Sequence, residues 1–363
     1  MALTIQEGLF LRLFPPPKYL RLPALGVDLS DHSIRYVEFG EKNNKRIIKR
    51  YGQVPIPDGV VTSGDIKDKA KLTEILKNFA EKNNVRFVRC SLPEEKAYLF
   101  KIDVPTLSAE ETRDNIAFQL EENVPIKAAD AIFDYVFLPD RGDGSSVREV
   151  VVLVFPRTVI KEYMDIYASA SITPLSFEME AHAIARALIR EDDLSCYMIV
   201  DFGMERTGLS IVERGVVQFT STVEVGGILL TDAIQRQFNV SREEADRIKR
   251  EESFVGHGAH QEFFSTLMNS ISALSDEINK HYVYWHTHGD RKGRKPAQIQ
   301  KIILCGGDAN LGGLVEHLSL TLKTRVEIGN VWTNVFSEDE IPDIPFDASL
   351  SYTTAIGLAL RAL

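Results

Sequence analysis

The chain has 363 residues, 44% of them apolar and 26% charged, which is the composition of a globular protein with a full hydrophobic core. Its net charge of -10 argues against sequence-independent binding to nucleic acid, because that binding needs a basic surface. The length suits two lobes of roughly 150 residues or more. Three well-separated cysteines, Cys90, Cys196 and Cys305, form no CxxC pair and are expected in the core of a protein from a reducing compartment.

The first 21 residues form an apolar and proline-rich tail. Leu3–Phe14 is interrupted only by a few polar residues and is followed by three prolines. A signal peptide is not expected, since no small-residue cleavage site follows, and no stretch reaches the ~18 apolar residues that span a bilayer. Two interpretations stay open: an amphipathic helix on a membrane or a partner, or a tail that is free or packed on its own domain.

A strand–turn–strand hairpin is predicted over 24–39, where apolar residues alternate on both sides of a polar turn. The β pattern continues over 47–54. Residues 68–83 are expected to form a helix, because Leu72, Leu76 and Phe79 fall on one face. A strand at 85–91 follows, and 173–189 is predicted as a strand leading into a helix.

Between these segments, residues 103–171 have the pattern of a small α+β subdomain inserted into the first lobe. A helix should begin near Ser108, where Ser108 and Glu111 have the spacing of a capping box. Strands are predicted over 133–138 and 147–155, joined by a turn at Gly142 and Gly144. A second helix is expected over 157–169.

The second half of the chain begins like the first, with an apolar strand, an aspartate, a turn and a second strand. Strands are predicted at 196–203, 207–212, 216–223 and 301–307, and helices at 229–237, 241–251, 262–286 and 352–360. Ser241 and Glu244 have the spacing of a helix start. The repeated opening predicts a duplicated α/β architecture.

Three segments have the residues of a nucleotide-binding site. The first hairpin carries Asp28, Ser30 and Ser33, the second carries Asp201, Gly203 and Thr207, and a glycine turn follows at Gly306 and Gly307. Turn N–H groups and hydroxyls can hold phosphate oxygens, and the carboxylates can hold Mg²⁺ through water. A Gly-Gly turn lets the backbone approach a flat ligand closely.

In this order the segments resemble the phosphate-1, connect-1, phosphate-2 and adenosine motifs of the actin-like ATPase superfamily. The matching stretches are LGVDLSDHSIRYVEF from residue 25, FEMEAHAIARAL from 177, IVDFGMERTGLSIVERG from 199 and ILCGGDANLGGL from 303. Within this superfamily the chain resembles the PilM family of type IV pilus assembly, which is related to FtsA. The stretch DFGMERT, the pair Gly226-Gly227 followed by LTDAI, and EEADRIK at 243–249 carry that resemblance.

The resemblance implies a two-lobed actin-like ATPase fold, a duplicated ribonuclease H-like α/β fold with an inserted small α+β subdomain and nucleotide in the cleft between the lobes. The first lobe would comprise 22–102 and 172–195, the insertion 103–171, and the second lobe 196–363 with a helical subdomain over 229–296. The implied ligands are ATP and Mg²⁺, with Asp28 and Asp201 as the metal residues through water. Beyond the hairpin residues, the resemblance places Gly226 and Gly227 near the phosphates and Glu244 and Lys249 near the ribose or base. It places Gly306, Gly307 and Leu311 around the base. Glu180 is implied as a catalytic partner of a metal-bound water.

By the same resemblance, the expected function is an ATP-binding cytoplasmic scaffold of the type IV pilus, or a related secretion-like assembly platform, peripheral at the inner membrane. It would bind a cytoplasmic peptide of a PilN-like protein, and further partners would be other platform proteins or the assembly ATPase. The family usually has a glycine at Ser30 and a lysine at Arg35, and these departures bear on hydrolysis more than on binding. The enzyme question therefore stays open, with a slow ATPase as the upper limit.

Two alternatives remain: a filament-forming FtsA-like division protein, and a small-molecule kinase of the same superfamily. The first would want a C-terminal amphipathic helix, and the second a catalytic aspartate that no segment supplies. His281, His286 and His288 are interpreted as a polar helix end, because His281 and His286 are five residues apart and do not share a helix face. The basic run 291–295 is interpreted as a solvated loop.

Overall fold

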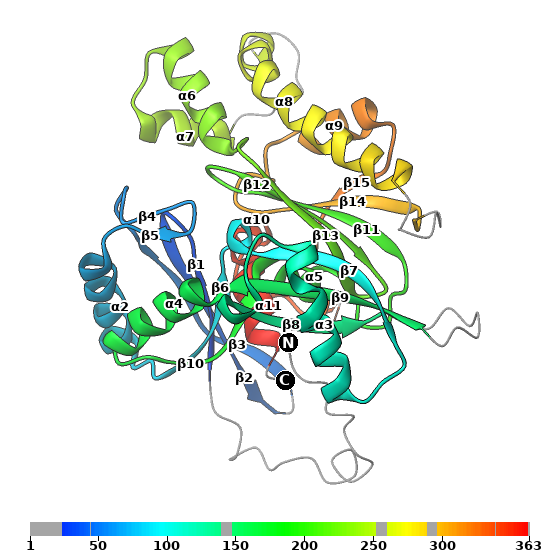
Figure 1. Ribbon diagram of the computed structural model, residues 1–363. Coiled ribbons are helices and arrows are strands. Elements are labelled where there is room, and N and C mark those ends of the chain that lie inside the picture. Colours follow the sequence, from blue (N-terminus) through cyan, green and yellow to red (C-terminus); the bar gives the residue numbers. More distant parts are fainter. Residues whose placement is uncertain are drawn as a thin grey trace. The chain divides into compact units, whose positions relative to one another are not determined.

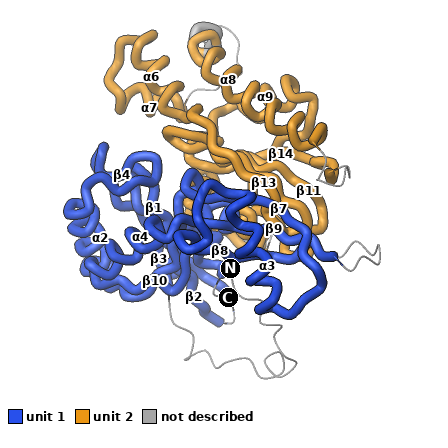
Figure 2. Tube along the Cα trace, in the orientation of Figure 1, with its two compact units in different colours: residues 1–184, 354–363 blue, residues 185–353 orange. Residues whose placement is uncertain are grey.

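The computed structural model describes residues 24–43, 45–138, 147–251, 260–288, 296–337 and 339–361. The predicted tail 1–21, the turn at Gly142 and Gly144, and the basic run 291–295 lie outside these ranges. The chain divides into two compact units, coloured separately in Figure 2. Unit 1 consists of Met1–Ile184 with Thr354–Leu363, and unit 2 of Ala185–Thr353.

Unit 1 is built on a five-stranded sheet in the order β10-β6-β1-β2-β3 (Figure 1). The three strands that follow one another in sequence form an antiparallel meander, and β6 and β10 add to it in parallel. Their bounds are β1 (Leu25–Leu29), β2 (Ser33–Lys42), β3 (Lys45–Pro55), β6 (Phe87–Leu92) and β10 (Thr173–Met179). The predicted first hairpin is thereby confirmed. A two-stranded ribbon of β4 (Val61–Thr62) and β5 (Asp65–Ile66) and the turn η2 (Glu94–Lys96) complete the connections.

Helices α2 (Lys69–Asn83) and α4 (Arg157–Ser169) cover one face of this sheet. Tyr36 of β2 meets Phe79 of α2 with 5.0 Å between ring centroids, and Tyr167 of α4 lies 6.2 Å from Phe177 of β10. Asp68 caps α2 by accepting the backbone N–H of Lys71 at 2.9 Å, so the predicted helix begins one residue after Asp68.

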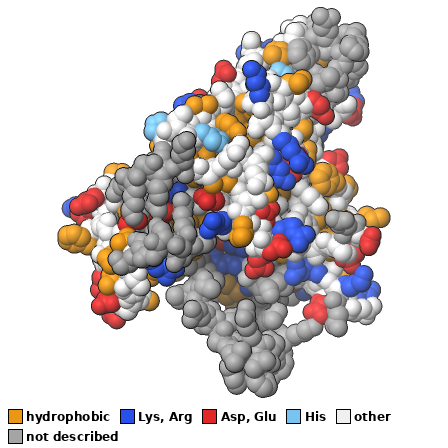
Figure 3. Space-filling model, turned by 90° about the vertical axis from the view of Figure 1, so that its right-hand side faces the viewer, with side chains coloured by type: hydrophobic (Ala, Val, Ile, Leu, Met, Phe, Trp, Pro, Cys, Tyr) orange, Lys and Arg blue, Asp and Glu red, His pale blue; other side chains and the backbone are white. Residues whose placement is uncertain are grey.

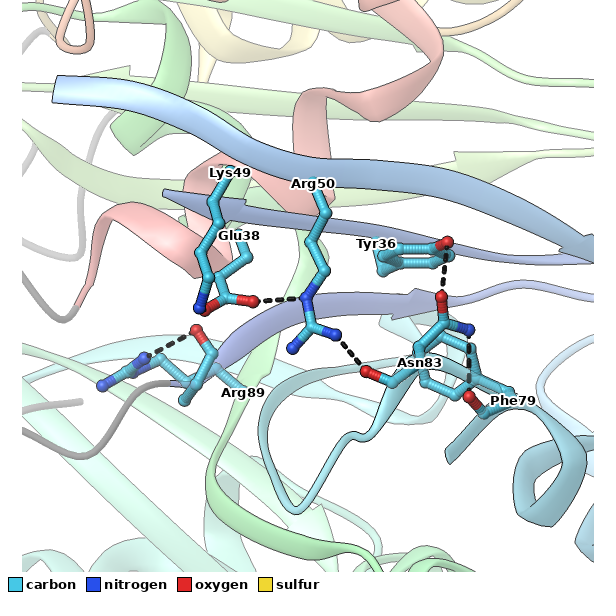
Figure 4. Close-up of polar contacts among 8 residues, drawn as sticks. Tyr36, Glu38, Lys49, Arg50, Phe79, Asn83 and Arg89 are labelled. Carbon is cyan, nitrogen blue, oxygen red and sulfur yellow. Dashed lines mark hydrogen bonds and ion pairs between the residues drawn. The ribbon is translucent and has the colours of Figure 1, made fainter. Parts of the chain in front are cut away.

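A buried carboxylate ties β2 and β3 to the end of α2 (Figure 4). The side chain of Glu38 is 4% exposed and accepts from Lys49 at 2.6 Å and from Arg50. Arg50 also donates to the carbonyl of Asn83, whose side chain accepts from the Tyr36 hydroxyl at 3.2 Å. The network satisfies the buried charge and fixes the C-terminus of α2.

On the opposite face lie α5 (Glu180–Leu188) and α11 (Thr353–Leu360), which approach the sheet through glycines. A Cβ on Gly26 of β1 would lie 2.5 Å from the backbone nitrogen of Ala359, and a Cβ on Gly357 would overlap the carbonyl of Ala183. Backbone against backbone packing of this kind is open only to glycine.

The helix α11 groups with unit 1, where Gly26 and Gly357 leave room for it. Unit 2 begins at Ala185, within α5, and its Asn334 donates to the carbonyls of Arg186 and Ile189 at 2.8 and 2.6 Å. The expected lobe bounds, 22–102 with 172–195 and 196–363, stay a prediction, as does the wider division into two lobes and an insertion.

A separate three-stranded sheet in the order β7-β9-β8 overlaps the predicted insertion 103–171, although its first strand begins before it, at Tyr98. It contains β7 (Tyr98–Pro105), β8 (Ala131–Phe137) and β9 (Val147–Pro156), with α3 (Ala109–Asn123) and the turn η3 (Ala128–Asp130) beside it. Ser108 and Glu111 form the predicted capping box. In the small core beside this sheet, Ile116 and Leu120 of α3 pack with Val150, Val152 and Val154 of β9. Helix α4 packs instead on α2 and on β10 of the five-stranded sheet.

Unit 2 contains a second five-stranded sheet, in the order β13-β12-β11-β14-β15. Its strands are β11 (Cys196–Phe202), β12 (Thr207–Glu213), β13 (Val216–Val223), β14 (Ile299–Cys305) and β15 (Val326–Ile328). The helices are α6 (Gly227–Phe238), α7 (Arg242–Glu251), α8 (His260–Thr287), α9 (Leu314–Leu322) and α10 (Phe346–Ser349), followed by the turn η4 (Leu350–Tyr352).

The two sheets have the same topology: an antiparallel meander of three strands, then two further strands parallel to the first. The predicted duplication is therefore confirmed. All three cysteines are free and buried, as expected of core residues. On the face shown in Figure 3, Lys and Arg side chains are interspersed with Asp and Glu. Within the described ranges, no helix has the length and apolar character needed to cross a membrane.

Candidate functional site

Asp28 lies near the end of β1 and is 8% exposed. Its carboxylate accepts a hydrogen bond from the Ser91 hydroxyl at 2.9 Å, and the same hydroxyl accepts the backbone N–H of Leu29 at 3.2 Å. Burial raises the pKa of Asp28, while the positive charge of Arg35 and the bond from Ser91 oppose that rise. A bound cation beside this carboxylate would be favourable, because burial disfavours the charged carboxylate and a nearby positive charge favours it.

Ser30 and Ser33 close the turn that follows Asp28. The Ser30 amide donates to the carbonyl of Ser33 at 3.0 Å, and its hydroxyl donates to the same oxygen at 3.1 Å. Asp31, within this turn, accepts from the amides of Ser63 at 2.9 Å and Gly64 at 3.2 Å. The first predicted loop is thus held on both sides, by its own strands and by the β4–β5 ribbon.

In unit 2, the loop after β11 closes onto the start of α6. The amide of Gly227 donates to the carbonyl of Gly203 at 3.0 Å, and the amide of Ile228 donates to that of Met204 at 2.7 Å. Thr207 donates its hydroxyl proton to the carbonyl of Val225 at 2.6 Å. A Cβ on Gly226 would overlap the Met204 carbonyl, so a glycine is needed where the helix meets the loop.

The glycine turn after β14 passes directly beside Asp201. Gly306 has φ of +93°, and a Cβ there would lie 2.5 Å from the carboxylate oxygen Oδ1 of Asp201. The thiol of Cys305 approaches the same oxygen at 3.9 Å, and burial, followed by the charge of Asp201, raises the pKa of Cys305. Both the positive φ and the lack of space require glycine at 306.

Lys249 of α7 is buried and reaches this turn. Its Nζ atom lies 2.5 Å from Oδ1 of Asp308, 3.3 Å from Oδ1 of Asp246 and 3.4 Å from the carbonyl of Gly227. Asp308 in turn is held by its amide, which donates to the carbonyl of Phe202 at 3.1 Å. The structure therefore joins the ends of β11 and β14 with the start of α6 and the last turn of α7.

The other predicted residues lie at the margins of these clusters. Glu244 pairs with Arg247 at 2.5 Å on the surface of α7, and that pair lowers its pKa. Leu311 is buried and Gly307 is exposed, with Ser351 Cβ 3.6 Å from the position of a Cβ on Gly307. Glu180 is half-buried at the start of α5, where its charge contributes to raising the pKa of Tyr163.

The structure thus brings together, within unit 2, Asp201, Gly203, Gly226, Gly227, Thr207, Lys249 and Gly306, and within unit 1, Asp28, Ser30 and Ser33. Their predicted roles toward a ligand stay predictions. Sequence reasoning missed Ser91, Asp31 and Asp308, although Asp308 is a charged residue directly after a glycine pair. In the part of the chain that the structure describes, no group of three or more His, Cys, Asp or Glu side chains could hold a metal ion.

Comparison with known protein families decides between the families named above. The model of the family described as type IV pilus assembly protein PilM matches residues 26–363. The chain belongs to the PilM family.

Solved structures agree with this PilM assignment at the level of the fold. A structure described as the PilM–PilN type IV pilus biogenesis complex is 21% identical, with a TM-score of 0.75, over 94% of this chain and 99% of that one. The ethanolamine utilization protein EutJ of Carboxydothermus hydrogenoformans is 17% identical with a TM-score of 0.55, over 95% and 90% of the two chains. MreB5 of Spiroplasma citri bound to AMPPNP is 13% identical with a TM-score of 0.55, over 95% and 96%. The expected actin-like ATPase fold is confirmed.

Proposed function

We propose that this PilM-family protein is an ATP-binding cytoplasmic scaffold of the type IV pilus assembly platform, positioned at the inner membrane through a PilN-like partner. The observation that carries the proposal is the family match over residues 26–363. The topology adds to it, because the two hairpins with their aspartates recur at equivalent places in two sheets of the same order.

The residues present fit a nucleotide. Gly306 and Gly226 bring backbone close to neighbouring backbone and to Asp201, where any Cβ would collide. A ligand can approach the backbone of such tight loops closely, because the glycines have no side chain. We assign the phosphates to the loops after Asp28 and Asp201 and to Gly226 and Gly227, and the base and ribose to Lys249, Glu244 and the turn from Gly306 to Leu311.

The residues also fit Mg²⁺ held through water. Carboxylate oxygens are the ligands that Mg²⁺ prefers, and the ion commonly keeps several waters and binds substrate phosphates. Asp28 and Asp201 would hold it, and it would supply positive charge against the phosphates. Asp28 supports this assignment because its buried carboxylate has a raised pKa and therefore gains from a nearby cation. Glu180 is assigned as a partner of a metal-bound water. Because Ser30 stands where the family usually has a glycine, any hydrolysis would be slow.

The PilM–PilN structure motivates the choice of partner, since its description names a complex of the two proteins. We assign to this chain the binding of a short cytoplasmic peptide of a PilN-like protein, in a groove beside the sheet β7-β9-β8. Other platform proteins or the assembly ATPase are further partners. Membrane association would be indirect, through that partner, or would use the tail 1–21.

Calorimetric titration with ATP and Mg²⁺ tests the nucleotide part of the proposal. We expect micromolar binding that is lost in Asp201→Ala and weakened in Asp28→Ala, with Asp192→Ala, an exposed aspartate paired with Arg190, as the matched control. Loss of binding in all three variants alike would count against the site. Titration with a synthetic PilN-like peptide tests the partner, and absence of binding with and without nucleotide would refute the scaffold role.

A further inference from the structure

The ion pair between Lys249 and Asp308 has no role in the function proposed above. Both side chains are largely withdrawn from water, with 7% of Lys249 and 13% of Asp308 exposed. The second carboxylate near Lys249, that of Asp246, is farther away at 3.3 Å and is shared with Arg250 at 2.5 Å. Asp308 is therefore the nearer of the two carboxylates that pair with this buried ammonium group.

The position of the Asp308 carboxylate is fixed from two sides. Its backbone amide donates to Phe202 at the end of β11, and the carboxylate lies against Gly227, where a Cβ would overlap both of its oxygens. Gly227 is the first residue of the 12-residue helix α6. A negative charge is favoured at a helix N-terminus, so the carboxylate is stabilised there by the helix and by Lys249 together.

We infer that the Asp308 carboxylate is an internal competitor of the nucleotide: it neutralises Lys249 and covers Gly227 at the start of α6, where the phosphates are assigned, so a nucleotide phosphate has to displace it from there. The inference rests on the proposed nucleotide site, to which Lys249 and Gly227 belong. A carboxylate and a phosphate repel each other strongly where both are shielded from water. The pair with Lys249 reforms when the nucleotide leaves, so the empty site does not retain an unpaired buried charge.

The test compares nucleotide affinity in variants that differ by one charge. Asp308→Asn keeps the shape of the side chain and removes its charge, and Asp308→Ser serves if the amide variant does not fold. Glu251→Gln is the control, because Glu251 is on the same helix as Lys249 but is 59% exposed and pairs with Arg247. Each protein is titrated with ATP and with ADP, with Mg²⁺, at one fixed ionic strength, and its folding is checked by thermal melting.

We expect Asp308→Asn to bind ATP at least about fivefold more tightly than the unmodified chain, which is the lower end of ordinary coupling between sites. The affinity of Glu251→Gln for ATP should stay within a factor of about two of the unmodified chain, because the pair that it removes is exposed. Unchanged or weaker binding by Asp308→Asn, or an equal gain in the control, overturns the inference and leaves nucleotide binding intact. Detectable ATP binding by Asp308→Asn, with none by the unmodified chain or by Glu251→Gln, supports the inference. Absence of binding by every variant at millimolar ATP overturns the nucleotide site, and the inference with it.

Discussion

Replacing Glu38 by Gln should destabilise unit 1 far more than removing Lys49, the exposed partner of Glu38. The Glu38 side chain is 4% exposed and interacts with Lys49, which is 55% exposed, and with Arg50, which is 30% exposed. The bond to Lys49 resembles a surface ion pair and is worth at most about 1 kcal/mol. Arg50 is held between Glu38 and the Asn83 carbonyl (Figure 4), so losing the carboxylate leaves a partly buried guanidinium without its counter-ion.

Breaking a buried pair by removing one partner costs about 3–5 kcal/mol. Because Arg50 keeps one carbonyl and some contact with water, we expect the lower part of that range, about 3 kcal/mol. For a unit of this size, each kcal/mol lowers the Tm by roughly 2–4 °C, so Glu38→Gln should melt roughly 6–12 °C below the unmodified chain.

The assay is thermal unfolding followed by circular dichroism at neutral pH, with Lys49→Met as the matched control. The control removes one charge of the same cluster, and we expect a fall in the Tm of no more than about 4 °C. If Glu38→Gln is no less stable than Lys49→Met, the argument from burial is refuted. Chemical denaturation should give the same order of stabilities.

Three further outcomes can be measured on the same protein. Gly357→Ala should lower the Tm by the equivalent of about 1–3 kcal/mol or prevent folding, because its Cβ would overlap the Ala183 carbonyl. Gly40→Ala is the control: its Cβ would have its nearest neighbours at 3.4 Å and beyond, so it should lose clearly less stability. Equal losses of stability in the two variants would contradict the packing argument. Asp28→Asn should raise the Tm at pH 7: burial raises the pKa of Asp28 in the folded state, so its contribution to stability is present at low pH and is lost as the pH rises through that pKa. The gain should shrink as the pH falls to 4, and a variant less stable than the unmodified chain at pH 7 would contradict this. Burial raises the pKa of Cys90 to about 12, and all three thiols are buried, so a thiol reagent at pH 8 should modify none of them in the native protein and all three after unfolding; rapid modification of the native protein would contradict their burial.

Local signals were sufficient where the physics is local. The first hairpin, the capping box of Ser108 and the start of α7 at Ser241 all depend on residues within a few positions of one another. The repeated strand–Asp–turn–strand pattern predicted the duplication, because each copy specifies its own meander. Buried strands such as β11 and β14 were recognisable from their continuous apolar runs.

Features that depend on distant partners were not predictable in the same way. The helix α11 has an apolar sequence that suits either unit, and only the space beside Gly26 and Gly357 decides where it packs. Strand β7 was missed because Lys101 and Asp103 interrupt its apolar pattern, although β9 pairs with it along its whole length. The counter-ion of Lys249 was missed because Asp308 is 59 positions away in sequence and meets it only in three dimensions.

The origin of unit 1 from two separate parts of the chain has a consequence for its synthesis. Its sheet is complete once β10 has been made, but α11, which packs on Gly26, follows 169 residues of unit 2, from Ala185 to Thr353. At roughly 5–20 residues per second, the ribosome needs on the order of 10–30 s to deliver that helix. During this interval the β1 surface around Gly26 is without its helix, and unit 1 is finished only after the last residue of unit 2, Thr353, has been made.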